Sequence, residues 1–260
     1  MTATTQLMEE LRAPAAPGRL ERGLSAIARH ANPTLDPHHI DVQLDQLADQ
    51  HGDHDPGGLC ASLFGDSGLR PNTNNYYDPN NSLIDRVLAR RRGIPLSLSA
   101  VALAVAERRA TPLRGIAMPG HFLLAHGEDP HRFYDPFAGG RQMSFADVAE
   151  LHVRLLGTAL VPDQLAPVGH RVMLLRTLAN LRVAYGRHGD LEGLAWVLEL
   201  LAESRPPGTE ATQELAVVLS RLGRWDEAAA ACSALADSLG EGAPAERWRG
   251  EAARLRTLLN

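Results

Sequence analysis

Between residues 98 and 134 the hydrophobic pattern changes from the period of a helix to the period of a strand. Residues 98–106 are apolar at nearly every position, which is typical of a helix that is buried on all sides. The short runs at 113–118, 122–125 and 132–134 indicate strands, and Gly127-Glu128-Asp129-Pro130 predicts the turn between the last two. A buried helix followed by a small antiparallel sheet predicts an α+β fold.

Helical periodicity flanks this segment on both sides. Apolar spacing predicts helices at 20–31, 37–50 and 59–64, and again from about residue 167. We expect residues 1–18, rich in Thr and Ala and containing two prolines, to be disordered or frayed. Residues 19–160 should form the α+β domain, and residues 167–260 a separate all-α domain.

The C-terminal part contains an internal repeat. Gly189-Asp190-Leu191-Glu192 recurs as Gly223-Arg224-Trp225-Asp226, and the two glycines are 34 residues apart. This spacing is the period of the tetratricopeptide repeat, a helical hairpin that stacks on its neighbours. Because stacked repeats form extended binding surfaces, we expect residues 167–260 to bind a peptide or a partner protein.

Charge and composition exclude other classes of partner. The net charge is −5, and no block of like charge exceeds three residues, so a nucleic-acid partner is not expected. The chain has no apolar run of about 18 residues, the length that a membrane span needs, and we expect a cytoplasmic protein without a membrane partner. Cys60 and Cys232 have no metal or redox spacing, and we expect no cofactor.

Three residues form a candidate catalytic group. If the hairpin is centred on Glu128, His121 lies directly opposite Asp135, with Cβ atoms about 4.5–5.5 Å apart. An Asp in that place orients the imidazole and supports its protonated form. Ser97, at the predicted start of the buried helix, is the candidate nucleophile and needs His121 as a general base. The alternative is that Ser97 only caps this helix.

Residues around this group are expected to line a cleft. They are Tyr76, Tyr77 and Asp78, in the Asn-rich segment 72–81, together with Ser99 and Phe122. For the tyrosines the alternative is that they pack the loop onto the core.

Histidines elsewhere in the chain do not predict a metal site. His51 and His54, with Asp53 and Asp55, lie in a polar segment that predicts a solvated turn. His121 and His126 are separated by an odd number of positions, so strand alternation directs them to opposite faces. His131 alone cannot complete a three-His site, and no metal is expected.

Four motifs in order resemble the SirB-type branch of the transglutaminase-like superfamily. They are Asn75-Tyr76-Tyr77-Asp78-Pro79, Arg91-Arg92-Gly93-Ile94-Pro95, Pro119-Gly120-His121-Phe122 and Asp135-Pro136-Phe137. The resemblance covers roughly residues 20–240 and includes the C-terminal repeats, which are similar to the tetratricopeptide-like region of that bacterial branch. It implies a papain-like core with a Cys-His-Asp geometry. The His position corresponds to His121, the Asp position to Asp135 and the Cys position to a site near Ser97, with Ser99 next.

The sequence therefore supports three hypotheses. The first is an enzyme that transfers an acyl group, or hydrolyses an amide or ester, at Ser97, His121 and Asp135. The second is a non-catalytic scaffold that binds a peptide or protein through the cleft and the helical repeats. In the third, His121 and Asp135 act on a substrate that supplies its own nucleophile. Cys60 is a further candidate nucleophile if the fold brings it to His121.

Overall fold

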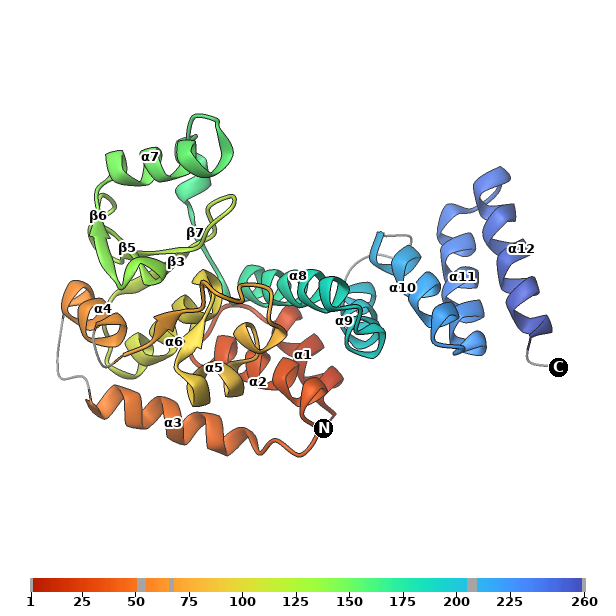
Figure 1. The fold of residues 1–260 in the computed structure, drawn as a ribbon, viewed down its shortest axis with the longest axis horizontal. Helices are drawn as coiled ribbons and strands as arrows, with labels where there is room; N and C mark the ends of the chain where they lie inside the picture. Colours follow the sequence, from red (N-terminus) through yellow and green to blue (C-terminus); the bar gives the residue numbers. More distant parts are fainter. Residues whose placement is uncertain (1, 51–54, 66–67, 205–209, 259–260) are drawn as a thin grey trace. The chain divides into compact units, whose positions relative to one another are not determined.

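The computed structural model describes residues 2–50, 55–65, 68–204 and 210–258. The chain forms two compact units, Met1–Thr177 and Leu178–Asn260. The first unit combines helices with a small antiparallel sheet, and the second is helical (Figure 1). The predicted α+β class is confirmed.

The N-terminal segment is folded, which corrects the expectation of disorder in residues 1–18. Helix α1 (Ala3–Arg12) begins after Thr2, whose side chain accepts the Thr5 N–H. Its residues Leu7, Met8 and Leu11 are buried. The Glu10 carboxylate is also buried, and it pairs with Arg19 at 2.9 Å and with Arg22 at 2.8 Å. Apolar spacing and a capping Thr, both present in the sequence, explain why this short segment is a helix.

Further helices of the first unit precede the buried helix. They are α2 (Arg19–Ala31), α3 (Pro37–Gln50), α4 (Pro56–Phe64) and α5 (Ile84–Arg90). A parallel pair of two-residue strands, β1 (Arg70–Pro71) and β2 (Arg92–Gly93), joins the loop after α4 to the start of the buried helix. The short 3-10 helix η1 (Pro79–Asn81) lies in the Asn-rich segment.

The central helix α6 (Pro95–Arg108) is buried along most of its length, as its apolar sequence predicts. It begins three residues earlier than expected, after Ile94. Pro95 suits the first helical position, because proline lacks the N–H that would have no partner there and its φ is already helical. Ser97 therefore lies within the first turn, and the expectation that it is the N-cap residue is wrong.

The main sheet has the strand order β6-β5-β4-β3-β7, and every neighbouring pair is antiparallel. Its strands are β3 (Leu113–Ile116), β4 (Leu123–His126), β5 (Phe133–Asp135), β6 (Arg141–Met143) and β7 (Pro167–Val168). The 3-10 helices η2 (Pro136–Ala138) and η3 (Pro162–Leu165) follow β5 and precede β7. The strands predicted at 113–118, 122–125 and 132–134 are thus present in shortened or shifted form.

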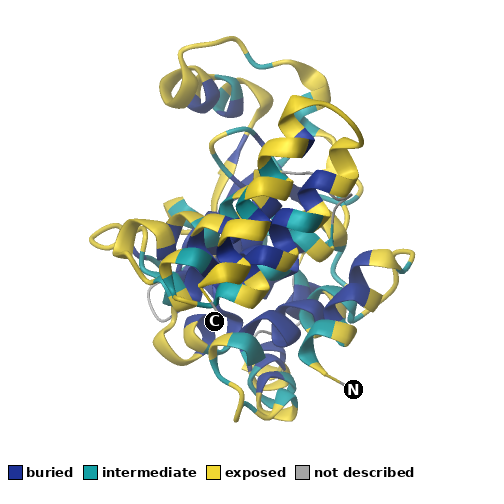
Figure 2. Cartoon of the chain, turned by 90° about the vertical axis from the view of Figure 1, so that its right-hand side faces the viewer, coloured by how far each residue is buried: buried dark blue, intermediate teal, exposed yellow. Residues whose placement is uncertain are grey.

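The two faces of the sheet carry different helices (Figure 1). Helix α7 (Phe145–Leu156) packs Val148 and Leu151 into a cluster with Ile116, Leu123 and Phe133. Helix α6 covers the other face, where Gly115 permits a close approach. A Cβ at position 115 would lie 3.0 Å from the Phe122 ring and 3.3 Å from the Leu103 side chain. Buried residues face inward from these helices, whereas exposed residues concentrate on loops and outer surfaces (Figure 2).

The second unit continues from α8 (His170–His188), which spans the division between the units. It contains α9 (Leu191–Glu203), α10 (Glu210–Arg221), α11 (Trp225–Leu239) and α12 (Ala243–Thr257). Gly189 and Gly223, the two glycines of the sequence repeat, both adopt positive φ values, 67° and 75°, just before α9 and α11. The repeated sequence thus marks equivalent turns, while a tetratricopeptide architecture stays a prediction, as do the domain bounds 19–160 and 167–260.

Candidate functional site

His121 and Asp135 lie in direct contact. Nε2 of His121 is 2.9 Å from Oδ1 of Asp135, and the two side chains are 9% and 8% exposed. His121 follows a tight turn in which its N–H donates to the Met118 carbonyl and Gly120 has a φ of 75°. Asp135 ends β5, where Oδ1 also accepts the Phe137 N–H at 2.9 Å. The main chain therefore fixes the carboxylate, and the carboxylate fixes the imidazole.

The contact arises from a different strand register than the sequence suggested. Leu124 pairs with Tyr134 and Ala125 with Phe133, so β5 is shifted by two residues relative to a hairpin centred on Glu128. His121 lies two residues before β4 and reaches Asp135 diagonally. The expected contact is present although the register was wrong, because a two-residue shift keeps each side chain on its face.

The second nitrogen of the His121 ring, Nδ1, takes no part in the contact with Asp135. When Nε2–H donates to Asp135, Nδ1 of the neutral ring carries a lone pair. Among the described residues Nδ1 has no protein hydrogen-bond partner, and it is not one of the unpaired polar atoms that the fold buries. A nitrogen in this position can accept a proton from a group that approaches from solvent.

The Ser97 hydroxyl is engaged by the main chain. It donates to the Asn81 carbonyl at 2.5 Å and accepts the Ile94 N–H at 3.0 Å. Gly93 makes room for this arrangement, since a Cβ there would lie 2.5 Å from Ser97 Oγ. Among the described residues no hydrogen bond joins Ser97 to His121. The geometry gives Ser97 the role of a helix-start hydroxyl, and its role as a nucleophile stays a prediction.

Asn81 connects the Asn-rich loop to α6, a role that the sequence did not suggest. Its side chain is fully buried, accepts from Nδ2 of Asn72 at 2.9 Å and donates to the carbonyls of Asn75 and Tyr76 at 2.7 and 3.1 Å. Its own carbonyl accepts the Ser97 hydroxyl. The run of asparagines, interpreted only as a loop signal, was the available indication.

Aromatic rings extend from His121 to the surface. The His121 ring contacts Phe137 at 6.3 Å between centroids, and Phe137 contacts Tyr76 at 5.9 Å, both edge-on. Tyr76 in turn contacts Tyr77 at 5.3 Å, and the two tyrosines are 39% and 40% exposed. Burial raises the pKa of Tyr76 despite the opposing effect of Arg176. Tyr76 is thus the predicted lining residue with a ring path to His121.

The other predicted lining residues have internal roles. Asp78 caps η1 by accepting the Asn80 N–H and pairs with Arg90 at 2.8 Å. Ser99 is fully buried, and its hydroxyl has no hydrogen-bond partner among the residues that the structure describes. Phe122 is 1% exposed and packs under a guanidinium. Ser99 and Phe122 are therefore not accessible to a ligand from solvent, whereas the lining role of Asp78, which is partly exposed, stays a prediction.

Arg176 is the residue near His121 that the sequence did not suggest. It lies on α8, and its guanidinium is 5.7 Å from the centre of the Phe122 ring. It donates to the carbonyls of Met118 and His121, each at 3.4 Å. The available indication in the sequence was a charge that directly follows the apolar residues 172–175.

Cys60 does not provide the missing thiol. The residue is completely buried in α4, and burial, reinforced by Asp55, raises the pKa of its thiol to about 12. Because the thiolate is the nucleophilic form, this cysteine is inert at neutral pH.

Histidines and carboxylates do not assemble a metal site in the described part of the chain. No group of three His, Cys, Asp or Glu side chains has ligand spacing there. Nδ1 of His126 instead accepts the N–H groups of Glu128 and Asp129 and so holds the hairpin turn. Asp55 caps α4, while His51, Asp53 and His54 lie outside the described residues.

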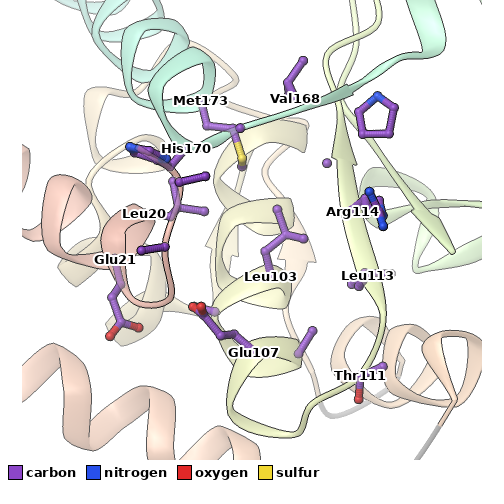
Figure 3. Close-up of a pocket in the computed structure, with 17 residues that line it drawn as sticks. Leu20, Glu21, Leu103, Glu107, Thr111, Leu113, Arg114, Val168, His170 and Met173 are labelled. Atoms are coloured by element: carbon purple, nitrogen blue, oxygen red, sulfur yellow. The ribbon is translucent and has the colours of Figure 1, made fainter. Parts of the chain in front are cut away.

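A separate hollow of about 640 Å³ lies at the other end of α6 (Figure 3). Its lining includes Leu103 and Glu107 of α6, Leu113 and Arg114 of β3, and Met173 of α8. Neither His121 nor Asp135 contributes to it. Glu107 is occupied there, because both of its oxygens accept the Gly18 N–H.

Known proteins resemble this chain in sequence. Residues 20–179 match the transglutaminase-like superfamily. A "UPF0162 protein" of Xylella fastidiosa (strain 9a5c) is 33% identical over 167 residues, which cover 62% of this chain and 59% of that protein. "UPF0162 protein PA3419" of Pseudomonas aeruginosa is 33% identical over 184 residues, 67% of each chain.

A more distant relative is eukaryotic. Human "F-box only protein 21" is 28% identical over 151 residues, 55% of this chain and 23% of that protein. No solved structure is significantly similar to the chain. Within the described residues, no helix has the length and hydropathy needed to cross a membrane.

Proposed function

Because the chain belongs to the transglutaminase-like superfamily, we propose that it catalyses acyl transfer or hydrolysis at an amide or ester, with His121 as the general base and Asp135 as its orienting partner. The observation that carries the proposal is the 2.9 Å contact between Nε2 and Oδ1, which leaves Nδ1 available. The nucleophile is water or an amine or hydroxyl of the substrate. Ser97 has its hydroxyl committed to Asn81 and Ile94, which argues against it as nucleophile.

The reaction balances with these two residues. Nδ1 of His121 removes a proton from the incoming water or amine, whose lone pair attacks the acyl carbon. Asp135 stabilises the imidazolium that forms and remains ionised. The imidazolium then returns the proton to the departing alcohol or amine as the acyl–leaving-group bond breaks. Water as nucleophile yields the acid, and an amine yields a new amide.

Turnover of a panel of p-nitrophenyl esters and peptide p-nitroanilides, with and without a primary amine, tests the proposal. His121→Ala should lower the rate by about 10²–10⁴-fold. Asp135→Asn should lower it less, while Ser97→Ala should keep it at temperatures where the variant is folded. Turnover that survives His121→Ala would overturn the proposal. An acyl adduct on Ser97, seen by intact-protein mass spectrometry and lost in Ser97→Ala, would restore Ser97 as nucleophile.

A second candidate function is a scaffold that binds a peptide or protein through the helical unit. A hollow of about 370 Å³ between α10, α11 and α12 is lined by Val217, Trp225, Trp248 and Leu258, among others. Val217 and Leu258 are 54% and 49% exposed. Apolar side chains presented in a hollow favour a peptide with apolar anchors.

Pull-down with the whole chain separates the two functions. A scaffold predicts partners that persist with His121→Ala and are lost with the surface change Val217→Glu combined with Leu258→Glu. Partners that depend only on His121 would contradict the scaffold hypothesis.

A further inference from the structure

Arg176 is a partly buried arginine without an acidic partner among the described residues. Its two hydrogen bonds, to the carbonyls of Met118 and His121, are both 3.4 Å long. That length is well beyond the usual N–H···O distance of about 2.9–3.0 Å, so both bonds are weak. A guanidinium has five N–H donors, and most of those of Arg176 remain available.

Three other partly buried arginines of this protein, Arg108, Arg182 and Arg224, are instead paired with carboxylates. Arg108 pairs with Glu21 and Asp45 at 2.5 and 2.6 Å. Arg182 pairs with Glu210 and Glu214, and Arg224 with Glu199 and Glu227. Each has two carboxylates within ion-pair distance. Arg176 departs from this pattern at the place where the candidate base lies.

The surroundings of Arg176 are those of the reactive pair. The guanidinium donates to the main chain of His121 and covers the ring of Phe122, the next residue. Burial lowers the pKa of Arg176, and Tyr76 opposes this effect. Tyr76 also reaches the His121 ring through Phe137. The guanidinium, the imidazole and three aromatic rings are therefore linked by these pairwise interactions.

We propose that Arg176 binds a carboxylate of the acyl substrate beside His121, so that the substrates are acyl compounds that carry one carboxylate. The inference rests on the proposed function. A guanidinium binds a carboxylate through two parallel hydrogen bonds, and such charge-assisted bonds are stronger in a partly desolvated place. A single arginine offers one positive charge, which matches one carboxylate better than it matches a phosphate dianion.

Calorimetry with two anilides of equal chain length tests this site without requiring turnover. Glutaranilic acid carries one free carboxylate, and valeranilide is its neutral counterpart. In the unmodified protein the carboxylate compound should bind more tightly. Arg176→Gln should reduce the ratio of the two affinities about 10- to 100-fold, the value of a charge-assisted hydrogen bond. Arg176→Lys should restore part of the ratio, since charge returns without the planar fork.

Arg114→Gln is the matched control, because it removes an equal charge from an exposed residue of β3 that lines the separate hollow. It should leave the ratio unchanged. A ratio unaffected by Arg176→Gln in a folded variant, or one lowered equally by Arg114→Gln, would overturn the proposal. So would tighter binding of the analogue with a phosphonate in place of the carboxylate.

The two proposals fail differently. Arg176-dependent binding without His121-dependent turnover would refute the proposed reaction and leave the carboxylate site standing. Turnover that depends on His121, is equal for neutral and anionic esters and is unaffected by Arg176→Gln would refute the carboxylate site and leave the proposed reaction standing. Circular dichroism of Arg176→Gln and Arg176→Lys checks that both variants are folded.

Discussion

Two serines of one helix provide a sharp test of the site's architecture. Ser97 and Ser99 lie in the first turns of α6 and are 7% and 0% exposed. The hydroxyl of Ser97 has partners in Ile94 and Asn81, whereas that of Ser99 has none within the described part of the chain. The same change, serine to alanine, should therefore have different effects at the two positions.

The magnitudes follow from the hydrogen bonds. Ser97→Ala leaves the Ile94 N–H and the Asn81 carbonyl without this partner, at about 1 kcal/mol or more each, so the loss should be about 2–3 kcal/mol. Ser99→Ala removes a buried hydroxyl that has lost its water without gaining a partner. Its effect should lie between neutral and about 1 kcal/mol of stabilisation.

Amide hydrogen exchange of α6, measured by mass spectrometry, reports the free energy of opening at the substituted helix. Ser97→Ala should accelerate exchange roughly 30-fold or more, and Ser99→Ala should not accelerate it. Tryptophan fluorescence is unsuitable, because Trp196, Trp225 and Trp248 all lie in the second unit. Equal destabilisation by the two changes, or none with Ser97→Ala, would refute the structural role assigned to Ser97.

Three further predictions concern the same unit. Gly93→Ala places a Cβ 2.5 Å from Ser97 Oγ and should lower the free energy of unfolding by about 1–3 kcal/mol. The loss should be smaller when Ser97→Ala is already present, and additive losses in a double-mutant cycle would contradict the clash. Burial raises the pKa of the Cys60 thiol from 9.0 to about 12, so the unfolded chain loses the thiol proton at lower pH than the folded chain does. The buried neutral thiol therefore contributes fully to the free energy of unfolding below about pH 9, and this contribution is lost as the pH rises toward 12. The urea midpoint should therefore fall more between about pH 8 and pH 10.5 than that of Cys60→Ala, and parallel curves would refute burial of the thiol. Glu10→Ala deprives Arg19 and Arg22 of their carboxylate and should reduce exchange protection of α1 by about 1 kcal/mol or more, whereas Glu9→Ala, at the exposed neighbour, should leave it unchanged.

Local pattern made much of the fold predictable. The nearly all-apolar run at 98–106 identified the central helix, and short apolar runs around a turn signal identified β4 and β5. The error in register came from centring the hairpin on Glu128, whereas His126 closes the turn through its side chain. Because the register was wrong by two residues, an even number, the side chains stayed on their faces and the contact between His121 and Asp135 could still be predicted.

Features that depend on distant residues could not be deduced in this way. Ser97 is 16 residues from the carbonyl of Asn81, and the guanidinium of Arg176 is 55 residues along the chain from the His121 carbonyl. The local sequence indicates a helix-capping hydroxyl and a charge at these positions, but it does not show which distant groups they contact. The misplaced start of α6 has a local cause, since Pro95 at the first helical position was the more informative residue.

The ends of the sheet limit how a substrate chain can be held. Strand β7 has two residues, one of them Pro167, which has no N–H to offer, and β6 has three. A peptide that binds by adding a strand needs a longer row of unpaired main-chain groups. The sheet therefore presents little template for strand addition or for edge-to-edge aggregation. This unit would therefore recognise an extended peptide through side chains and loops. The side chains of the peptide, more than its backbone, would then determine which peptides bind.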